Sequence, residues 1–209
     1  EFGQVSLRNG LDDMGVAVSG GEMVVAGDFS MHAPNVLSIS GTGSIQAASA
    51  QLRGTINHGE EGQLAVGNLA IGDSVLDTSY ALNQAGTISV AGNEMVGERG
   101  KVSVNQHGGQ HTVGGVLTVD GAGTEVGKRT AYYLRDGLLR AAQAVVGLER
   151  NGYLEQSDEG RAEFTQSLVL GGGTTGNGQG EYVLTGGELA AQETILGPVG
   201  KGVFRQYGG

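Results

Sequence analysis

The phrase "VGERGKVSVNQ" (residues 96–106) recurs as "VGLERNGYLEQ" (146–156) and again as "LGPVGKGVFRQ" (196–206). The three copies start 50 residues apart, with no insertion or deletion between them. Each copy ends in an apolar residue, a variable residue and Gln: Val104-x-Gln106, Leu154-x-Gln156 and Phe204-x-Gln206. Self-similarity at a fixed period predicts a repeat protein in which successive units stack on one another.

A related frame lies halfway between the copies. Tyr132-x-Leu134 precedes Asp136-Gly137, and Tyr182-x-Leu184 precedes Gly186-Gly187. The 50-residue phrase therefore consists of two units, one of 22 and one of 28 residues. Extended over the whole chain, the frame of an apolar residue shortly before a turn yields nine anchors, spaced 19–28 residues apart: Val16, Leu37, Ile56, Leu82, Val104, Tyr132, Leu154, Tyr182 and Phe204.

Each unit contains two or three short apolar runs separated by Gly turns, which is typical of a β-solenoid. One unit cannot bury its apolar face alone, so stacking must bury it. We therefore predict an all-β fold, favouring a right-handed parallel β-helix of about nine coils. Residues 1–209 would form a single domain, with residues 1–15 as a first partial coil and 16–209 as the repeats. With coils ~4.8 Å apart, the rod would be ~43 Å long and the nine anchors would form one inward-facing stack.

The composition agrees with this fold and excludes several classes of protein. The chain has 41 Gly, 2 Pro and no Cys, which rules out disulfides and thiolate metal sites. A net charge of -10 argues against nucleic acid as a partner, and the basic group Lys128, Arg129, Arg135 and Arg140 is interpreted as a solvated face. No run approaches the ~20 apolar residues of a membrane helix. Few Lys and many Gly, Ser and Thr favour an exported bacterial surface protein.

One segment has a competing interpretation. The stretch "LLRAAQAVVGLER" (138–150) has the composition of a helix of about three turns packed on the rod. It aligns without gaps with "ELAAQETILGPVG" (188–200), in which Gly197 and Pro198 would break a helix. The repeat therefore favours strands here.

The pattern G-x-Y-x-L-x-G-G-x-L, followed by a Gly-rich stretch ending in F-x-Q-x-G-G, resembles the repeat shared by autotransporter (type V secretion) passengers and PEP-CTERM surface proteins. The resemblance covers residues 82–209 closely and 1–81 loosely. It implies an extracellular β-solenoid that serves as an adhesin, a stalk or surface-layer material. That family defines no catalytic residues, so the resemblance assigns none to this chain.

The candidate chemical groups all have simpler structural interpretations. Glycoside hydrolysis needs two carboxylates ~5–9.5 Å apart. The acidic pairs Asp12-Asp13, Glu60-Glu61 and Asp158-Glu159 fall at or beside turns, where solvated charge is normal. A polysaccharide lyase or hydrolase is the residual enzymatic hypothesis.

No metal or cofactor site is predicted either. His107 and His111 are separated by a Gly-Gly turn rather than a helix, so we expect surface histidines, not a metal pair. The stretch "GGGTTGNGQG" (171–180) lacks the Asp of calcium-binding repeats and predicts a corner loop. "GAG" at 121–123 likewise predicts a turn, not a phosphate loop. We therefore expect no catalytic, cofactor or metal residues.

Two further expectations concern the glutamines and the ends. Gln84, Gln106, Gln156 and Gln206 share strand parity with the anchors, so each should hydrogen-bond corner backbone or lie at the edge of the rod.

Neither end carries a recognisable cap, which fits a fragment of a longer protein or a subunit that stacks head to tail. The predicted function is thus an extracellular scaffold, a stalk or a self-stacking filament subunit. Its partners would be its own copies, other surface proteins or a glycan. A polysaccharide-binding or polysaccharide-cleaving β-helix is the alternative.

Overall fold

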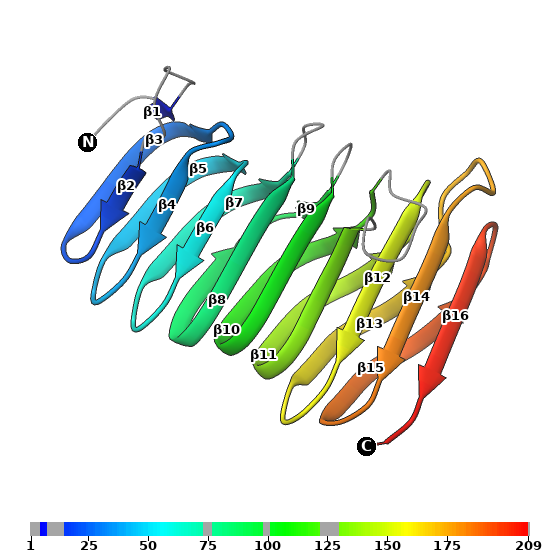
Figure 1. Cartoon of the computed structure of the whole chain (residues 1–209). Helices are drawn as coiled ribbons and strands as arrows, with labels where there is room; N and C mark the ends of the chain where they lie inside the picture. Colours follow the sequence, from blue (N-terminus) through cyan, green and yellow to red (C-terminus); the bar gives the residue numbers. More distant parts are fainter. Residues whose placement is uncertain (1–4, 8–14, 73–76, 98–100, 122–129, 209) are drawn as a thin grey trace.

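The computed structural model describes residues 5–7, 15–72, 77–97, 101–121 and 130–208. The predicted all-β solenoid is confirmed: sixteen strands form one continuous sheet, and neighbouring strands pair in parallel (Figure 1). Among the described residues no helix has the length and apolar character needed to cross a membrane. Parallel pairing of sequential coils satisfies backbone N–H and C=O groups along the axis of the rod.

The strands have the following bounds: β1 Val5–Leu7, β2 Gly15–Val18, β3 Glu22–Met31, β4 Val36–Ile39, β5 Ser44–Leu52, β6 Thr55–His58, β7 Gln63–Ile71, β8 Thr78–Val90, β9 Glu94–Val96, β10 Val102–Val119, β11 Thr130–Val146, β12 Asn151–Gln156, β13 Arg161–Leu170, β14 Gln179–Leu184, β15 Glu188–Leu196 and β16 Lys201–Gln206.

The strands form two long rows. The near row in Figure 1 contains β2, β4, β6, the first parts of β8, β10 and β11, and then β12, β14 and β16. The far row contains β3, β5, β7, β9, the second parts of β8, β10 and β11, and then β13 and β15. The chain descends along the near row and returns along the far row while it advances from the N-terminus to the C-terminus, so the coil is right-handed.

Both rows are present in eight coils, and β16 supplies the near strand of a ninth within the described residues. The count of complete coils is thus slightly below the expected nine. The register of the near row aligns eight of the nine anchors and replaces Leu82 with Tyr80. The prediction of Leu82 is wrong because the sequence frame aligns this residue by the turn that follows it. In the structure Leu82 pairs with His58 and Gln106, each of which lies two residues after the anchor of its own strand. The observed row is Val16, Leu37, Ile56, Tyr80, Val104, Tyr132, Leu154, Tyr182 and Phe204.

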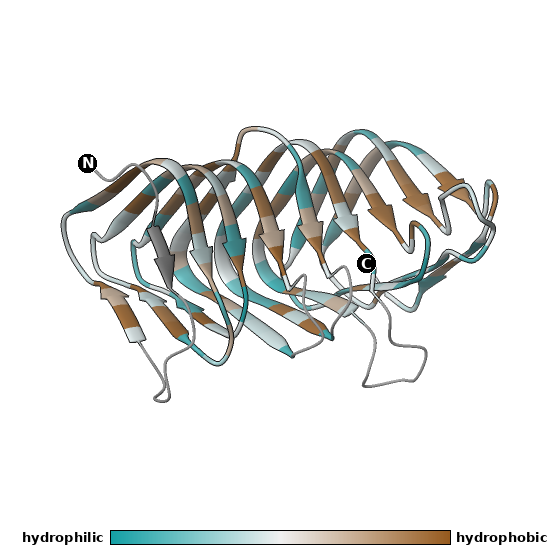
Figure 2. Ribbon diagram, turned by 90° about the horizontal axis from the view of Figure 1, so that it is seen from above, coloured by the Kyte–Doolittle hydropathy of each residue, from teal (hydrophilic) through white to brown (hydrophobic). Residues whose placement is uncertain are grey.

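The core runs along the axis of the rod. Hydrophobic residues alternate with polar ones along each strand and line up from coil to coil in Figure 2. From Leu37 to Tyr182 every residue of the near-row stack is at most 1% exposed, whereas Phe204 in the last described coil is only partly buried. The stack therefore extends through the whole described length of the rod.

The far row is bent at a register shift that recurs in successive coils. At this corner, polar side chains continue the axial hydrogen bonding. Asn68 Oδ1 accepts the backbone N–H of Asn93 at 2.9 Å, and Asn93 Oδ1 accepts that of Val116 at 2.9 Å. Further along, Gln143 Nε2 donates to Ser167 Oγ at 2.9 Å. Side chains thus tie adjacent coils together where the backbone ladder is interrupted.

The segment with the competing helical interpretation is a strand. Residues 138–146 lie in β11 and pair in parallel with β13, so the gapless alignment predicted the structure and local propensity did not. Of the expected partial coil at residues 1–15, the structure describes β1 and Gly15, and β1 pairs with the end of β3.

Candidate functional site

The two acidic pairs that the structure describes lie on turns. Glu60 and Glu61 occupy the tight turn 59–62, and Asp158 and Glu159 occupy the turn 157–160. Glu60 and Asp158 both have left-handed backbone, with φ of 55° and 53°. The two pairs are exposed and belong to different coils, so they do not form a pair of facing carboxylates. Asp12-Asp13, Lys128, Arg129 and most of "GAG" lie outside the described residues.

The histidine prediction is correct for His107 and wrong for His111. His107 is exposed on the near face, whereas His111 is completely buried. The Gly-Gly turn ends before His111, and the second part of β10 directs this side chain inward. His58 is also completely buried, so two histidines belong to the core. Among the described residues no group of three or more metal-ligating side chains is present.

The buried polar residues form a repeated contact that we call the polar clamp. It joins a His or Gln of one coil to the Tyr of the next coil. The three clamps are His58–Tyr80, Gln106–Tyr132 and Gln156–Tyr182. In each clamp the polar side chain also faces a backbone carbonyl at the corner, and in two of them this carbonyl is Gly62 O, at 2.7 Å, or Gly160 O, at 2.7 Å.

Two of the predicted glutamines behave as expected, and one does not. Gln106 Nε2 donates to Leu138 O at 3.1 Å, and Gln156 Nε2 donates to Glu188 O at 2.8 Å, both at the corner of the coil. Gln84 is instead an exposed turn residue with φ of 55°, and His58 occupies the position equivalent to Gln106. The frame Ile56-x-His58 already contained this signal, since it matches Val104-x-Gln106.

The hydrogen bonds of His58 fix its tautomer. Gly62 O can only accept, so Nε2 of His58 carries the proton. Nδ1 then accepts the hydroxyl proton of Tyr80 at 2.8 Å. Burial lowers the pKa of His58 to about 4, although the hydrogen bond to Gly62 opposes this and the nearby His111 adds to it. His58 is therefore neutral at physiological pH.

His111 adopts the opposite arrangement. The amide nitrogen of Gln106 donates to backbone carbonyls, so its Oε1 must accept the proton of Tyr132, at 2.6 Å. Tyr132 has no second proton, and Nδ1 of His111 must therefore donate to the Tyr132 hydroxyl at 2.8 Å. One proton remains for the 2.6 Å contact between His111 Nε2 and Glu94 Oε2, and both side chains are fully buried. Glu94 Oε1 has no hydrogen-bond partner among the described residues.

The Gly-rich stretch 171–180 forms a loop between β13 and β14, as expected, and the coil before it anchors this loop. The Glu149 carboxylate accepts the backbone N–H of Thr174 at 2.7 Å and also bonds the hydroxyls of Thr174 and Thr175. These bonds, with that from the Thr175 hydroxyl as the largest cause, lower the pKa of Glu149 to about 2. The loop therefore binds a carboxylate of the protein itself.

A groove lies on the near face where β4, β6 and β8 approach their turns. We call it the polar groove, and its volume is about 610 Å³. Buried Ile39 and His58 contribute to its lining. The other lining residues are Ser38, Ser40, Asn57, Gly59, Glu60, Asn83, Gln84 and His107.

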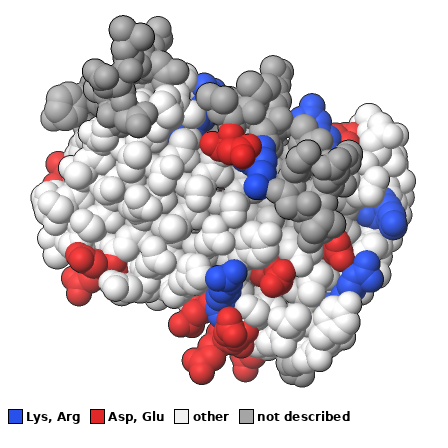
Figure 3. Space-filling view, viewed as in Figure 1, with Lys and Arg blue, Asp and Glu red and all other residues white. Residues whose placement is uncertain are grey.

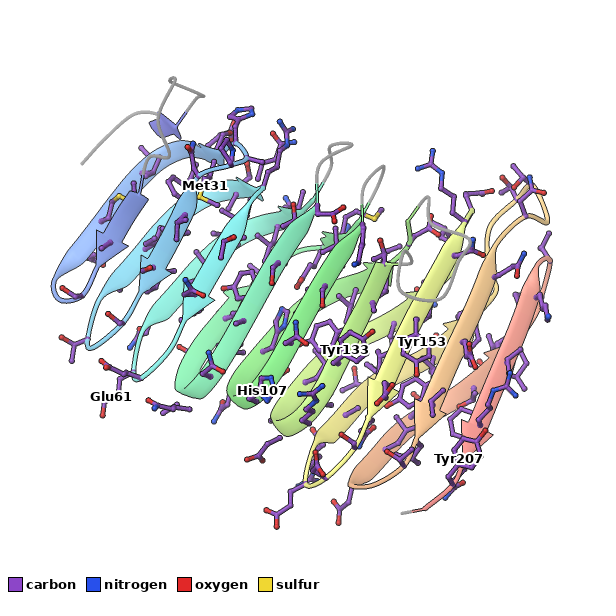
Figure 4. The ribbon with its side chains drawn as sticks, in the orientation of Figure 1. Met31, Glu61, His107, Tyr133, Tyr153 and Tyr207 are labelled. Carbon is purple, nitrogen blue, oxygen red and sulfur yellow. The ribbon has the colours of Figure 1, made fainter. Side chains whose placement is uncertain are left out.

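The surrounding face carries few charges. In Figure 3 the N-terminal half of the near face is largely uncharged, and charged side chains gather at its margins and toward the C-terminal coils. There, Arg205 of β16 pairs with Glu181 of β14 at 2.7 Å. Figure 4 shows His107 and Glu61 toward the lower edge of this face, with Tyr133 and Tyr153 beside each other on the strands that follow.

Comparisons of the chain with protein-family models, with curated proteins and with solved structures gave no significant match.

Proposed function

We propose that this chain is a rigid segment of an extracellular structural protein, a scaffold or stalk at a bacterial cell surface. The observation that carries the proposal is the axial continuity of the rod. The near-row stack, the parallel ladders and the polar clamps all join each coil to the next along one direction. Stacked coils with nearest-neighbour contacts form an elongated, stiff body.

The resemblance to autotransporter and PEP-CTERM repeats supports the extracellular location, and the absence of Cys and the scarcity of Lys agree with it. The two described acidic pairs lie on turns of different coils, which favours a structural role over polysaccharide cleavage. We therefore propose a role without catalysis.

A self-stacking filament is the second form of the proposal, and one observation favours it. The exposed large hydrophobic residues of the described chain are Leu196, Val199 and Tyr207, which lie at the end of β15, in the turn that follows and just after β16. The outer edge of β16 has no paired strand among the described residues. An open parallel edge with apolar side chains can accept another strand, and in the filament form a second copy would provide it.

Electron microscopy of the purified chain over a concentration series tests both forms. A scaffold segment should give isolated rods of roughly the ~43 Å expected from ~4.8 Å per coil. A filament subunit should give unbranched fibres that lengthen with concentration. Compact particles without a long axis would contradict the proposal. Antibodies against the chain should label intact, unpermeabilised cells of the source organism, and labelling only after permeabilisation would contradict the extracellular location.

A further inference from the structure

We propose that the polar groove binds a neutral oligosaccharide segment of a glycan chain. The proposal goes beyond the structural role, because it assigns a ligand class to one part of the rod. It begins with the shape of the groove. Glu60 and Gln84 turn the chain with left-handed φ values of 55° at successive coils, and the groove lies between these turns and the strands before them. Its volume of about 610 Å³ is within the ~300–1,000 Å³ of small-ligand sites.

The second observation is that the amide side chains of the groove make no hydrogen bond to the described part of the chain. Within the described part of the chain, the side chains of Asn57, Asn83 and Gln84 take part in no hydrogen bond, ion pair or ring contact. The amides elsewhere in the rod differ: Asn68 and Gln156, for example, are both used to join coils. Each primary amide offers two donors and an acceptor, so three neighbouring amides can match a ligand that carries many hydroxyl groups.

The third observation is charge. Among the described lining residues the only acidic one is Glu60, whose Oε2 already accepts the backbone N–H of Gly41, and none is Lys or Arg. A polyanion would find no cationic partner here and would meet a chain of net charge -10. An uncharged, hydroxyl-rich ligand fits this lining best.

A protein partner fits less well. Protein interfaces depend on apolar and aromatic anchors that become buried in their centre. In the described chain the exposed large hydrophobic residues all lie between positions 196 and 207, whereas the groove is lined by residues between 38 and 107.

Tyr133 offers a way to extend the site. It pairs with Asn105 of the preceding coil, on the strand that also carries Ser103. The ring of Tyr133 contacts that of Tyr153 edge-on, with centroids 6.0 Å apart. Tyrosine presents an apolar ring face together with a polar tip. A glycan that leaves the groove past His107 along the near face would reach this ring (Figure 4).

Affinity electrophoresis tests the proposal with soluble polysaccharides cast in native gels. The neutral probes are hydroxyethylcellulose, xyloglucan, galactomannan and dextran, and the anionic comparators are alginate and heparin. We expect retardation by at least one neutral probe. The combined Asn57→Ala and Asn83→Ala variant should bind that probe at least tenfold more weakly, and Tyr133→Ala should weaken binding to a smaller extent.

Gln192→Ala is the matched control, since it removes an exposed amide from β15 on the far row. It should bind like the parent, and both it and the groove variant should keep the parent's circular dichroism and unfolding midpoint, because the substituted groove amides make no hydrogen bond in the described fold. Tyr133→Ala also removes the ring contact with Tyr153, so its binding is compared at a temperature where circular dichroism shows it folded. The proposal is overturned if no neutral probe retards the chain, if only alginate or heparin does, or if the groove variant binds as well as Gln192→Ala. These outcomes are independent of rod shape, so they leave the proposed structural function to its own test.

Discussion

Replacing His58 by Gln should remove one source of acid sensitivity without weakening the rod at neutral pH. Gln is the residue that the repeat itself places at the equivalent positions 106 and 156. Its amide nitrogen can donate to Gly62 O and its oxygen can accept from Tyr80, which reproduces both hydrogen bonds of the neutral imidazole. We therefore expect the free energy of unfolding at pH 7.5 to stay within about 1 kcal/mol of the parent, as for a replacement that conserves a buried hydrogen bond.

The pH dependence follows from the lowered pKa. The folded pKa of His58 is about 4, below the ordinary histidine value of 6.5, so the unfolded chain binds a proton more readily. The stabilisation contributed by the neutral imidazole is complete above pH 6.5 and is lost as the pH falls toward 4. Between pH 7.5 and pH 5 the parent should lose about 2 kcal/mol through this residue, and about 3 kcal/mol once the pH is below 4.

The assay is urea unfolding of both proteins at pH 7.5, 6 and 5, followed by circular dichroism. Other titrating groups act equally on the two chains, so the difference between their pH profiles isolates His58. The profiles should diverge by about 2 kcal/mol at pH 5, with the His58→Gln variant the more stable. Parallel profiles, or an NMR titration of His58 in the folded state with a pKa near its ordinary value, would refute this account of the buried clamp.

Four further substitutions probe the interior and the corners. Glu94→Leu and His111→Leu should each destabilise the fold by about 3 kcal/mol, because either leaves an uncompensated polar partner in the core, whereas the double variant should be more stable than either single one in the same urea assay. Tyr182→Phe should cost about 1–2 kcal/mol, since Oε1 of its clamp partner loses a donor; an unchanged unfolding midpoint would contradict this. Gly180→Ala should cost at least about 2 kcal/mol, because a Cβ there would lie 1.9 Å from a backbone oxygen of the adjoining coil, while Gly172→Ala, with its nearest atom at 3.4 Å, serves as the tolerated control in thermal unfolding.

The solenoid was predictable because a parallel coil repeats its inward positions at every turn. The gapless alignment of 138–150 with 188–200 predicted strands even where local composition favoured a helix, and β11 bears this out. The alignment failed at Leu82 because it matched the residues before the turn at Gly86, and this turn places Gln84 in a left-handed conformation outside the strand register. A repeated sequence frame identifies the coils, but where a turn differs in length the frame selects the wrong residue as the inward-facing anchor.

The interior and outer sites were less predictable for a different reason. Whether His111 points inward depends on where the Gly-Gly turn ends, and a change of one residue reverses its direction. The polar groove depends on positive φ at two non-glycine residues, Glu60 and Gln84. Positive φ is uncommon for such residues, so their sequence does not predict it. The sequence shows the clamp partners only as two separate sets of recurring residues, the polar residues and the tyrosines. The structure shows that members of the two sets contact each other between adjacent coils.

The clamps also explain why the period of the sequence is two coils rather than one. Coils of the form Tyr-x-Leu alternate with coils of the form apolar-x-Gln: Tyr80-x-Leu82 is followed by Val104-x-Gln106, Tyr132-x-Leu134 by Leu154-x-Gln156, and Tyr182-x-Leu184 by Phe204-x-Gln206. A buried Tyr hydroxyl needs a partner, and a buried Gln amide needs more than its corner carbonyls. Two identical coils in succession, ~4.8 Å apart, would place Tyr over Tyr and Gln over Gln. Alternation gives each tyrosine ring an aliphatic neighbour in the preceding coil and gives Gln106 and Gln156 a hydroxyl donor in the next, so a pair of coils is the smallest repeated unit that satisfies these buried groups.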